Sequence, residues 1–187
     1  GNSMFAYHAK GVGIALVSSS AVVSDNTITS NSIYSSPGNE YGGGVYISGG
    51  APVISGNTIT RNQGPSTDGG GIYISDAAAT VSVNSIEDNS GDLGGAIYVS
   101  FSSPTIEGNV ISGNRSRGAG GGIYCITGDP LISNNEIRDN RVSGSSGTTG
   151  GGIFLQGSSA TVIGNAIEGN DVWTYGSQPA IGGGIYA

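Results

Sequence analysis

Three charged residues in the C-terminal half have the types and spacing that acid–base chemistry on an acidic sugar would need. Glu136 and Arg138 are two residues apart, and Glu168 stands at the position of Arg138 one repeat later. A cation could hold a sugar carboxylate while a neighbouring group takes a proton. Charge pairing along a surface β-ladder explains the same arrangement more simply. We therefore expect no catalytic site, and these three residues are the only candidates for one.

The other residue types that catalysis uses form no constellation. His8 is the only histidine and has no carboxylate near it in the sequence, and Cys125 is the only cysteine. Zinc needs several His or Cys ligands, and calcium needs several oxygen ligands in one place. The carboxylates here are scattered over different repeat positions. We expect no metal and no cofactor, and we lean against an enzyme.

Aromatic residues recur at one position of a repeated pattern and gather again in the last spacer between repeats. The recurring set is Tyr46, Tyr73, Tyr98, Tyr124, Phe154 and Tyr186, and the spacer holds Trp173 and Tyr175. Exposed aromatic rings in a line can bind sugar rings or a partner surface. Like residues on adjacent strands also stack for stability, and both roles can hold together. We predict that any ligand-binding surface is formed by these residues.

An internal repeat must position these side chains, and it decides the fold. Six 19-residue blocks align without a gap: 13–31, 44–62, 71–89, 96–114, 122–140 and 152–170. Each block contains three short segments in which apolar and polar residues alternate, the pattern of a half-buried strand. Three strands per repeat without a helical segment predict a coiling chain, in which each strand pairs with its equivalent one coil away.

The alignment places aliphatic residues in columns that would fill the interior of such a coil. One of these columns reads Ile28, Ile59, Ile86, Ile111, Ile137 and Ile167. Two asparagine columns, which begin at Asn26 and Asn31, flank the third strand. Asparagine tolerates left-handed turns, and stacked amides can hydrogen-bond along a ladder. We therefore interpret the asparagines as structural corner residues.

The spacers between the blocks vary in length but share one place in the coil. They cover 32–43, 63–70, 90–95, 115–121, 141–151 and 171–183, and each ends in two glycines. Because all of them leave the corner after the third strand, we expect them to form loops along one edge, beside the aromatic column. Loops on a rigid repeat are where recognition usually takes place.

The segments 54–60 (ISGNTIT) and 69–75 (GGGIYIS) carry a pattern that resembles the parallel β-helix repeat family of the pectin-lyase-like superfamily. The resemblance covers essentially the whole chain. It implies a right-handed coil and a secreted or cell-surface location. Members of the superfamily include polysaccharide lyases, hydrolases, epimerases, adhesins and passenger domains, so the fold does not choose an activity. The paired aspartates and the Gly-His-Gly element of its hydrolases do not occur here.

The repeat therefore predicts an all-β protein: a single-stranded, right-handed parallel β-helix with about six coils and three short strands per coil. We expect residues 1–187 to form a single domain, cut from a longer protein because both ends of the chain fall inside the repeat pattern.

Composition limits the possible partners. The formal net charge is −7, which repels phosphate backbones, so we expect no nucleic-acid partner. There is no polybasic patch for anionic lipid and no apolar run of about 20 residues, so we expect no membrane insertion.

Three functional hypotheses remain open. The first is an extracellular or cell-surface module that binds a polysaccharide, a surface glycan or another surface without catalysis. The second is a lyase-like enzyme acting on acidic polysaccharide. The third is a structural stalk or filament unit whose open ends self-associate.

Overall fold

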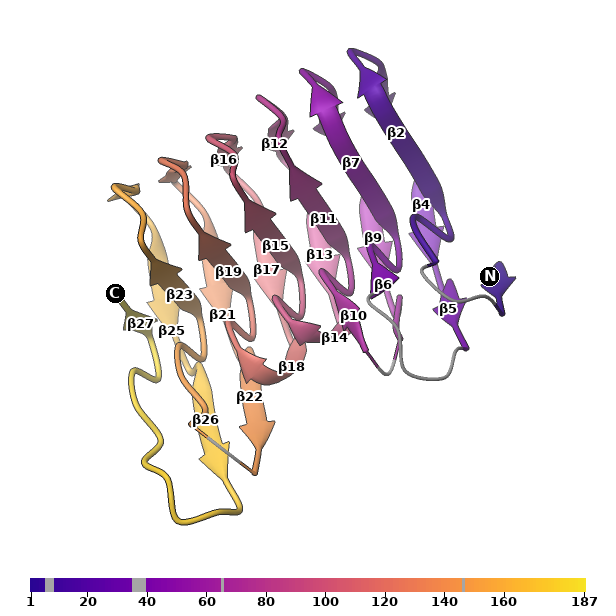
Figure 1. Cartoon of the computed structure of the whole chain (residues 1–187). Coiled ribbons are helices and arrows are strands. Elements are labelled where there is room, and N and C mark those ends of the chain that lie inside the picture. The colour runs from indigo at the N-terminus through magenta and orange to yellow at the C-terminus, as the bar shows by residue number, and fades with distance from the viewer. Residues whose placement is uncertain (6–8, 35–39, 65, 146) are drawn as a thin grey trace.

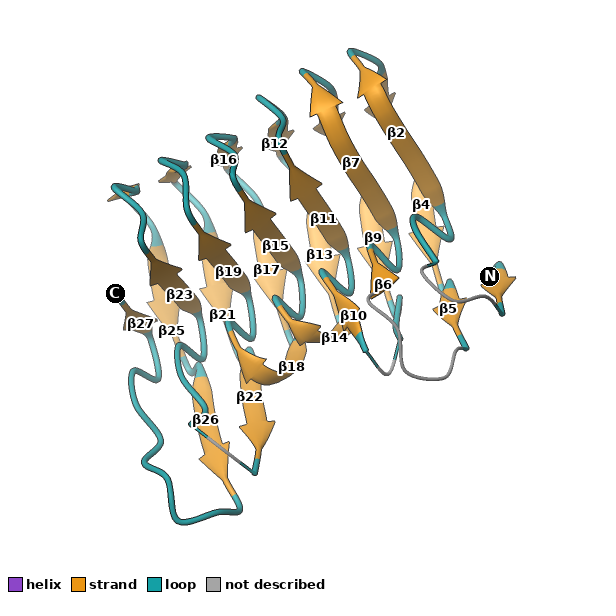
Figure 2. Cartoon of the chain, in the orientation of Figure 1, coloured by secondary structure: helices purple, strands orange, loops and turns teal. Residues whose placement is uncertain are grey.

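In a computed structural model the chain winds into about six stacked coils (Figure 1). The structure describes residues 1–187 except 6–8, 35–39, 65 and 146. All of its regular elements are strands, and no helix occurs among the described residues (Figure 2). Every strand pair is parallel, with one coil of chain between the two partners. The parallel β-helix predicted from the repeat is thus confirmed.

The three strands predicted for each block form three long parallel sheets. The first sheet contains β2 (Ile14–Ser19), β7 (Val45–Gly50), β11 (Ile72–Ser75), β15 (Ile97–Ser100), β19 (Ile123–Ile126), β23 (Ile153–Gln156) and β27 (Ile185–Tyr186). The second contains β3 (Val22–Ser24), β8 (Val53–Ser55), β12 (Thr80–Ser82), β16 (Thr105–Glu107), β20 (Leu131–Ser133) and β24 (Thr161–Ile163). The third contains β4 (Thr27–Thr29), β9 (Thr58–Thr60), β13 (Ser85–Glu87), β17 (Val110–Ser112), β21 (Glu136–Arg138) and β25 (Ala166–Glu168).

A fourth sheet runs through the spacers, where the sequence analysis expected only loops. It consists of β14 (Ser90–Leu93), β18 (Arg115–Ala119), β22 (Arg141–Gly144) and β26 (Asp171–Thr174). Shorter pairs continue the pairing in the first coils: β1 (Ser3–Met4) with β5 (Ser32–Ile33), and β6 (Glu40–Tyr41) with β10 (Thr67–Asp68). The reason is backbone satisfaction, because each spacer leaves its corner in register with the spacer one coil away and pairs its N–H and C=O groups there.

The interior of the coil is filled by the predicted aliphatic columns. Ile47, Ile74 and Ile106 are completely buried, and the same holds for Ile59, Ile86 and Ile111 in the column of the third sheet. Cys125 is also buried in an inward column, as a small apolar residue. Because the side-chain period of a strand is two, the buried columns fix the register of all three sheets.

The two asparagine columns form continuous hydrogen-bonded ladders. The Asn57 side chain is an example: Nδ2 donates to Oδ1 of Asn84 on the next coil at 3.0 Å and to the carbonyl of Val23 on the previous coil at 2.9 Å. Its backbone N–H donates to the same Asn84 Oδ1 at 2.9 Å. One amide therefore links three coils, and Asn57, Asn84 and Asn109 are buried.

The left-handed corner conformation falls on the residue before each ladder asparagine, and not on the asparagine as the sequence analysis proposed. Asp25, Val83 and Asn134 at one corner have φ values of 58°, 55° and 55°. Glycine fills the same position in other coils, for example Gly108 at 62°. The ladder asparagines are not among the positive-φ residues, and the ladder bonds hold both their backbone N–H and their side chain. Val83 is unusual, because a β-branched residue is disfavoured in this conformation.

The glycine pairs before the first sheet allow neighbouring coils to approach closely. A Cβ atom on Gly95 would lie 2.4 Å from the carbonyl oxygen of Gly121 and 2.6 Å from that of Arg115. No side chain fits at these distances, so the pair marks the place where each spacer re-enters the coil.

Candidate ligand-binding groove

The aromatic column predicted as a binding surface points out of the coil but is largely buried. From Tyr46 to Tyr186 the rings stack on one another, with centroids 4.8–5.4 Å apart and planes within 12°. Tyr46, Tyr73, Tyr124 and Phe154 are less than 10 % exposed. The stacked rings thus cover each other's faces, and the expectation of flat exposed rings is wrong for these four residues.

The spacers cover the aromatic column and turn it into a second apolar core outside the coil. Leu93 and Ala119, on β14 and β18, pack in one cluster with Tyr124 and Phe154. Burial raises the pKa of the Tyr73, Tyr98 and Tyr124 phenols above the ordinary value. A ligand-binding role of the column remains a prediction, while its geometry shows a packing role.

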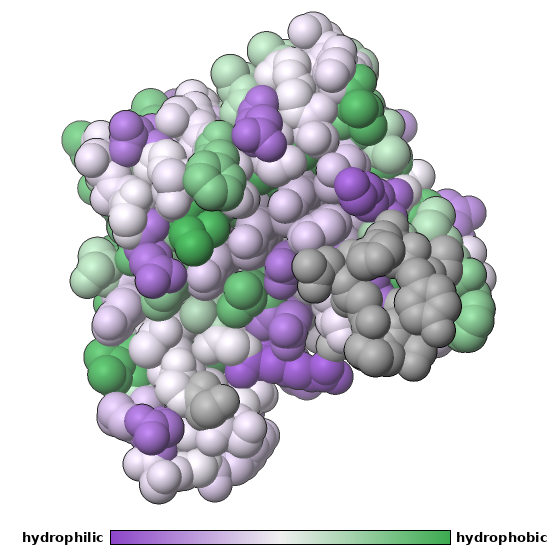
Figure 3. All heavy atoms as spheres, viewed as in Figure 1, coloured by the Kyte–Doolittle hydropathy of each residue, from purple (hydrophilic) through white to green (hydrophobic). Residues whose placement is uncertain are grey.

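The outer face of the fourth sheet presents charged and aromatic side chains. In β18 the exposed residues Arg115 and Arg117 alternate with the buried Ser116. In β26 the exposed Asp171 and Trp173 alternate with the half-buried Val172. Arg141 on β22 lies between these strands, since its Cα pairs with those of Arg115 and Asp171. Figure 3 shows a strongly hydrophilic cluster at the lower edge of the molecule, next to β18.

Trp173 is held by Arg141. The guanidinium carbon lies 4.6 Å from the centroid of the indole, a cation–π distance. The Asp171 carboxylate lies 3.9 Å from Arg141 Nε, which is too long for a hydrogen bond. About half of the Trp173 surface is nevertheless exposed. The indole is thus oriented by one neighbour and remains accessible to a ligand.

Two hollows lie along this face, and Arg117 lines both. The first runs over the early coils and is lined by Tyr34, Gln63 and Ser90. The second has a volume of about 560 Å³ and is lined by Asp92, Ser143 and Tyr175, among others. The two hollows share the Arg117 side chain and together span the spacers from Tyr34 to Tyr175, and we call this stretch the groove. With coils about 4.8 Å apart, five coil steps correspond to about 24 Å.

The tyrosines at the two ends of the groove are exposed but held by their backbones. Tyr175 donates its N–H to the carbonyl of Gly144 at 3.0 Å, and Tyr34 donates to that of Met4 at 2.9 Å. Their side chains are 72 % and 56 % exposed. Tyr175 and Trp173 were predicted from the sequence. Tyr34, Arg115, Arg117 and Arg141 were not, because the spacers differ in length and carry no repeat register of their own.

The family model for the right-handed β-helix region matches residues 7–187. The chain belongs to the right-handed β-helix family. The match confirms the handedness predicted from the repeat and the resemblance stated above. No curated protein and no solved structure shows significant similarity to this β-helix.

Two further residues that were not predicted from the sequence, both aspartates, lie beside the groove of this β-helix. Asp68 on β10 and Asp92 on β14 belong to successive spacers. Burial and the charge of Asp92 raise the pKa of the Asp68 carboxyl to about 7, although the Leu93 N–H lowers it. Asp68 stands one residue before the glycine pair that ends its spacer, and Asp92 stands two residues before the glycine pair of the next spacer. An alignment of the spacers on these glycine pairs would have placed the two aspartates at neighbouring positions. Within the described residues, no group of three or more His, Cys, Asp or Glu side chains could hold a metal ion.

The three charged residues considered for catalysis lie on the third sheet, outside the groove. Arg138 hydrogen-bonds to Glu136 and, at 3.2 Å, to Asp139, and its Cα pairs with that of Glu168. These carboxylates raise the pKa of Arg138, with Glu136 the larger cause, which is the opposite of what a catalytic base needs. The geometry therefore agrees with surface charge pairing. His8 lies outside the described residues.

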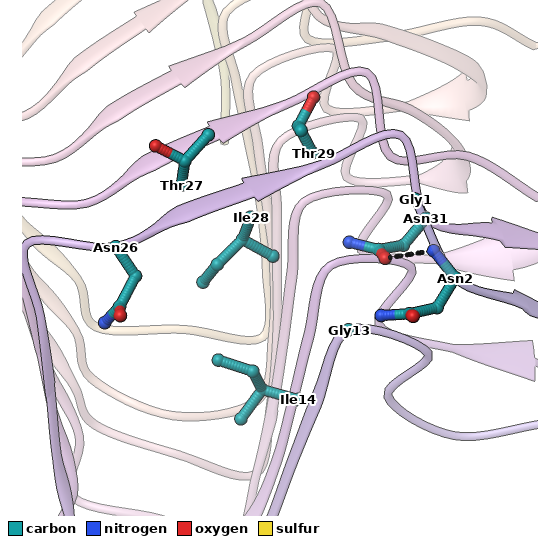
Figure 4. Close-up of a pocket in the computed structure, with 9 residues that line it drawn as sticks. All are labelled: Gly1, Asn2, Gly13, Ile14, Asn26, Thr27, Ile28, Thr29 and Asn31. Carbon is teal, nitrogen blue, oxygen red and sulfur yellow. Dashed lines mark hydrogen bonds between the residues drawn. The ribbon is translucent and has the colours of Figure 1, made fainter.

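A further hollow lies over the first coil. It is lined by Ile14 and Ile28 of the inward columns and by Asn26 and Asn31 of the ladders (Figure 4). The Asn2 N–H donates to Asn31 Oδ1 at 2.9 Å. The Asn31 N–H makes the equivalent bond to Asn62 Oδ1 on the next coil. Residues of the repeating interior thus line this hollow, so we do not regard it as a separate site. Among the described residues, no helix is long and apolar enough to cross a membrane.

Proposed function

We propose that this β-helix is a non-catalytic carbohydrate-binding module of a secreted or cell-surface protein, and that the sugar chain lies along the outer face of the fourth sheet. The observation that carries the proposal is the groove from Tyr34 through Arg117 to Tyr175. The groove is elongated and open, which suits a linear chain.

The side chains along the groove suit a ligand that is part apolar and part hydrated. Tyr34 and Tyr175 line the groove and offer large rings with polar tips, and Trp173 lies beside it as the strand neighbour of Ser143. Ser90 and Ser143 offer hydroxyl groups for hydrogen bonds. All of them stand on paired strands or on segments hydrogen-bonded to those strands. Little conformational entropy would therefore be lost on binding, which favours affinity.

The binding surface predicted from the sequence lay on the aromatic column of the first sheet, and the proposal places it on the outer face of the fourth sheet. Trp173 and Tyr175 remain in it, and the stacked aromatic column becomes its support. The lyase hypothesis has weaker support, because Arg138 is already paired with carboxylates on another sheet.

A glycan array tests the proposal with the wild-type protein and the variants Trp173→Ala and Tyr175→Ala. Phe101→Ala is the matched control, since Phe101 is 66 % exposed at the corner that follows the first sheet. We expect the wild type and the control to bind the same glycans, and both groove variants to lose at least tenfold in affinity. Equal binding by all four proteins would place the site elsewhere, and no binding by the wild type would reject the function.

A further inference from the structure

We infer that the ligand of this groove is a polyanionic glycan, a linear chain of sugars that carry carboxylate or sulfate groups. The inference rests on the proposed carbohydrate-binding function and specifies its ligand.

The charges of the molecule are distributed unevenly. The chain has six basic and thirteen acidic residues, for a net charge of −7. Arg115, Arg117 and Arg141 lie on the fourth sheet, and the acidic residues beside them are Asp68, Asp92 and Asp171. With Asp68 counted as ionised, this face has a local charge of 0. The remaining three basic and ten acidic residues give −7 over the rest of the chain. An anionic ligand is therefore repelled least by this face.

The arginines stand in an arrangement that an anion would relieve. Arg115 and Arg141 are direct neighbours on β18 and β22, and like charges at such positions repel. Arg115 is exposed and has no ion-pair partner in the described part of the chain. Among the described residues, Asp171 is the only ion-pair partner of Arg141, at 3.9 Å, and the Arg141 side chain is 39 % exposed. A carboxylate or sulfate group placed here could accept hydrogen bonds from both guanidinium groups.

The neighbouring side chains favour a glycan over other polyanions. Trp173 and Tyr175 supply exposed rings beside the arginines, which suit the apolar faces of sugars. A nucleic-acid duplex would need a broad basic surface, and the charge of −7 elsewhere opposes one. A single glycan strand in the groove contacts only the face that carries the three arginines.

Binding measurements on polygalacturonate, dextran sulfate, uncharged dextran and duplex DNA test the inference at low and moderate salt. The variants are Arg115→Gln and Arg141→Gln. Arg61→Gln is the control, because Arg61 is an exposed arginine at the corner after the third sheet. We expect the wild type and the control to bind at least one of the two polyanions, more weakly at higher salt, and not to bind dextran. Each of the two arginine variants should lose about tenfold in affinity and part of the salt dependence. Thermal melts establish that the variants are folded.

The outcomes separate this inference from the proposed function. Salt-independent binding to neutral glycans, unchanged in the arginine variants, would overturn the inference and leave the carbohydrate module intact. Equal affinity for duplex DNA and for the acidic glycans would also overturn it. If neither acidic nor neutral glycans bind, both the inference and the proposed function fail.

Discussion

Asn109 donates both its backbone N–H and its side-chain Nδ2 to a single oxygen, Oδ1 of Asn135, at 2.9 and 3.0 Å. The same Nδ2 also donates to the carbonyl of Val81 on the previous coil at 2.9 Å. Each rung of the ladder thus depends on the rungs on both sides, in a buried environment where an unpaired polar group is costly.

We expect Asn109→Ala to lower the free energy of unfolding by about 3 kcal/mol, since several buried donors and acceptors lose their partner at once. Urea denaturation followed by circular dichroism measures the change. Asn26→Ala is the control, because Asn26 is exposed and water can replace its bonds. Similar losses in the two variants would show that the buried position of Asn109 has no special weight.

Val83→Asn should stabilise the protein by about 1 kcal/mol, because asparagine tolerates the left-handed conformation that Val83 adopts at φ 55°. Asn134 already occupies the equivalent corner with the same φ. The midpoint of thermal unfolding should rise. Val22→Asn replaces an equally exposed valine in β3, where the backbone is extended, and should not raise the midpoint. An unchanged or lower midpoint for Val83→Asn would argue against strain at this corner.

Tyr124→Ser should destabilise the fold by about 3–5 kcal/mol, because it leaves a gap between the rings of Tyr98 and Phe154. The fraction that remains folded should bind glycan as the wild type does. Tyr175→Ser should show the reverse, with stability changed by less than about 0.5 kcal/mol and binding reduced. Chemical denaturation and glycan binding are measured on both variants. Loss of binding in folded Tyr124→Ser would return the aromatic column to the binding surface.

Stability should decrease as the pH rises from about 4 to about 7. The folded state holds the proton of Asp68 up to a pKa of about 7, against an ordinary value of 3.8, so deprotonation favours unfolding. The loss should be on the order of 2 kcal/mol after allowing for solvent screening. Asp68→Asn should remove most of this slope, and Asp76→Asn at an exposed corner should leave it unchanged. Unfolding free energies at several pH values measure it, and an unaltered slope in Asp68→Asn would contradict the assignment.

The repeat allowed most of the fold to be predicted, because each column repeats one physical requirement. Isoleucines at equivalent positions of successive coils, such as Ile59 and Ile86, indicated which side of each strand faces inward, and the asparagines indicated the corners. The candidate site was predicted less well. Tyr124 was placed correctly on the outward side of its strand, but whether the spacers cover it depends on their path.

The spacers carry too little sequence pattern to reveal that path. The short segments containing Arg117 and Asp92 have few alternating apolar residues, and their pairing in the fourth sheet depends on the neighbouring coil. The charged face formed by Arg115 and Arg141 appears only when spacers of different lengths are aligned from the asparagine that precedes each of them.

The spacer lengths have a consequence for how the protein can diversify. The strands of the 19-residue blocks tolerate no insertion, because one residue added within a strand would turn the buried side chains that follow it in that strand outward. The segments between an asparagine and the next glycine pair differ widely in length, and loop-closure entropy changes only slowly with loop length. New residues can therefore enter there with little loss of stability. Ligand preference can thus change by insertion, deletion or substitution along one edge, while the frame that presents it stays constant.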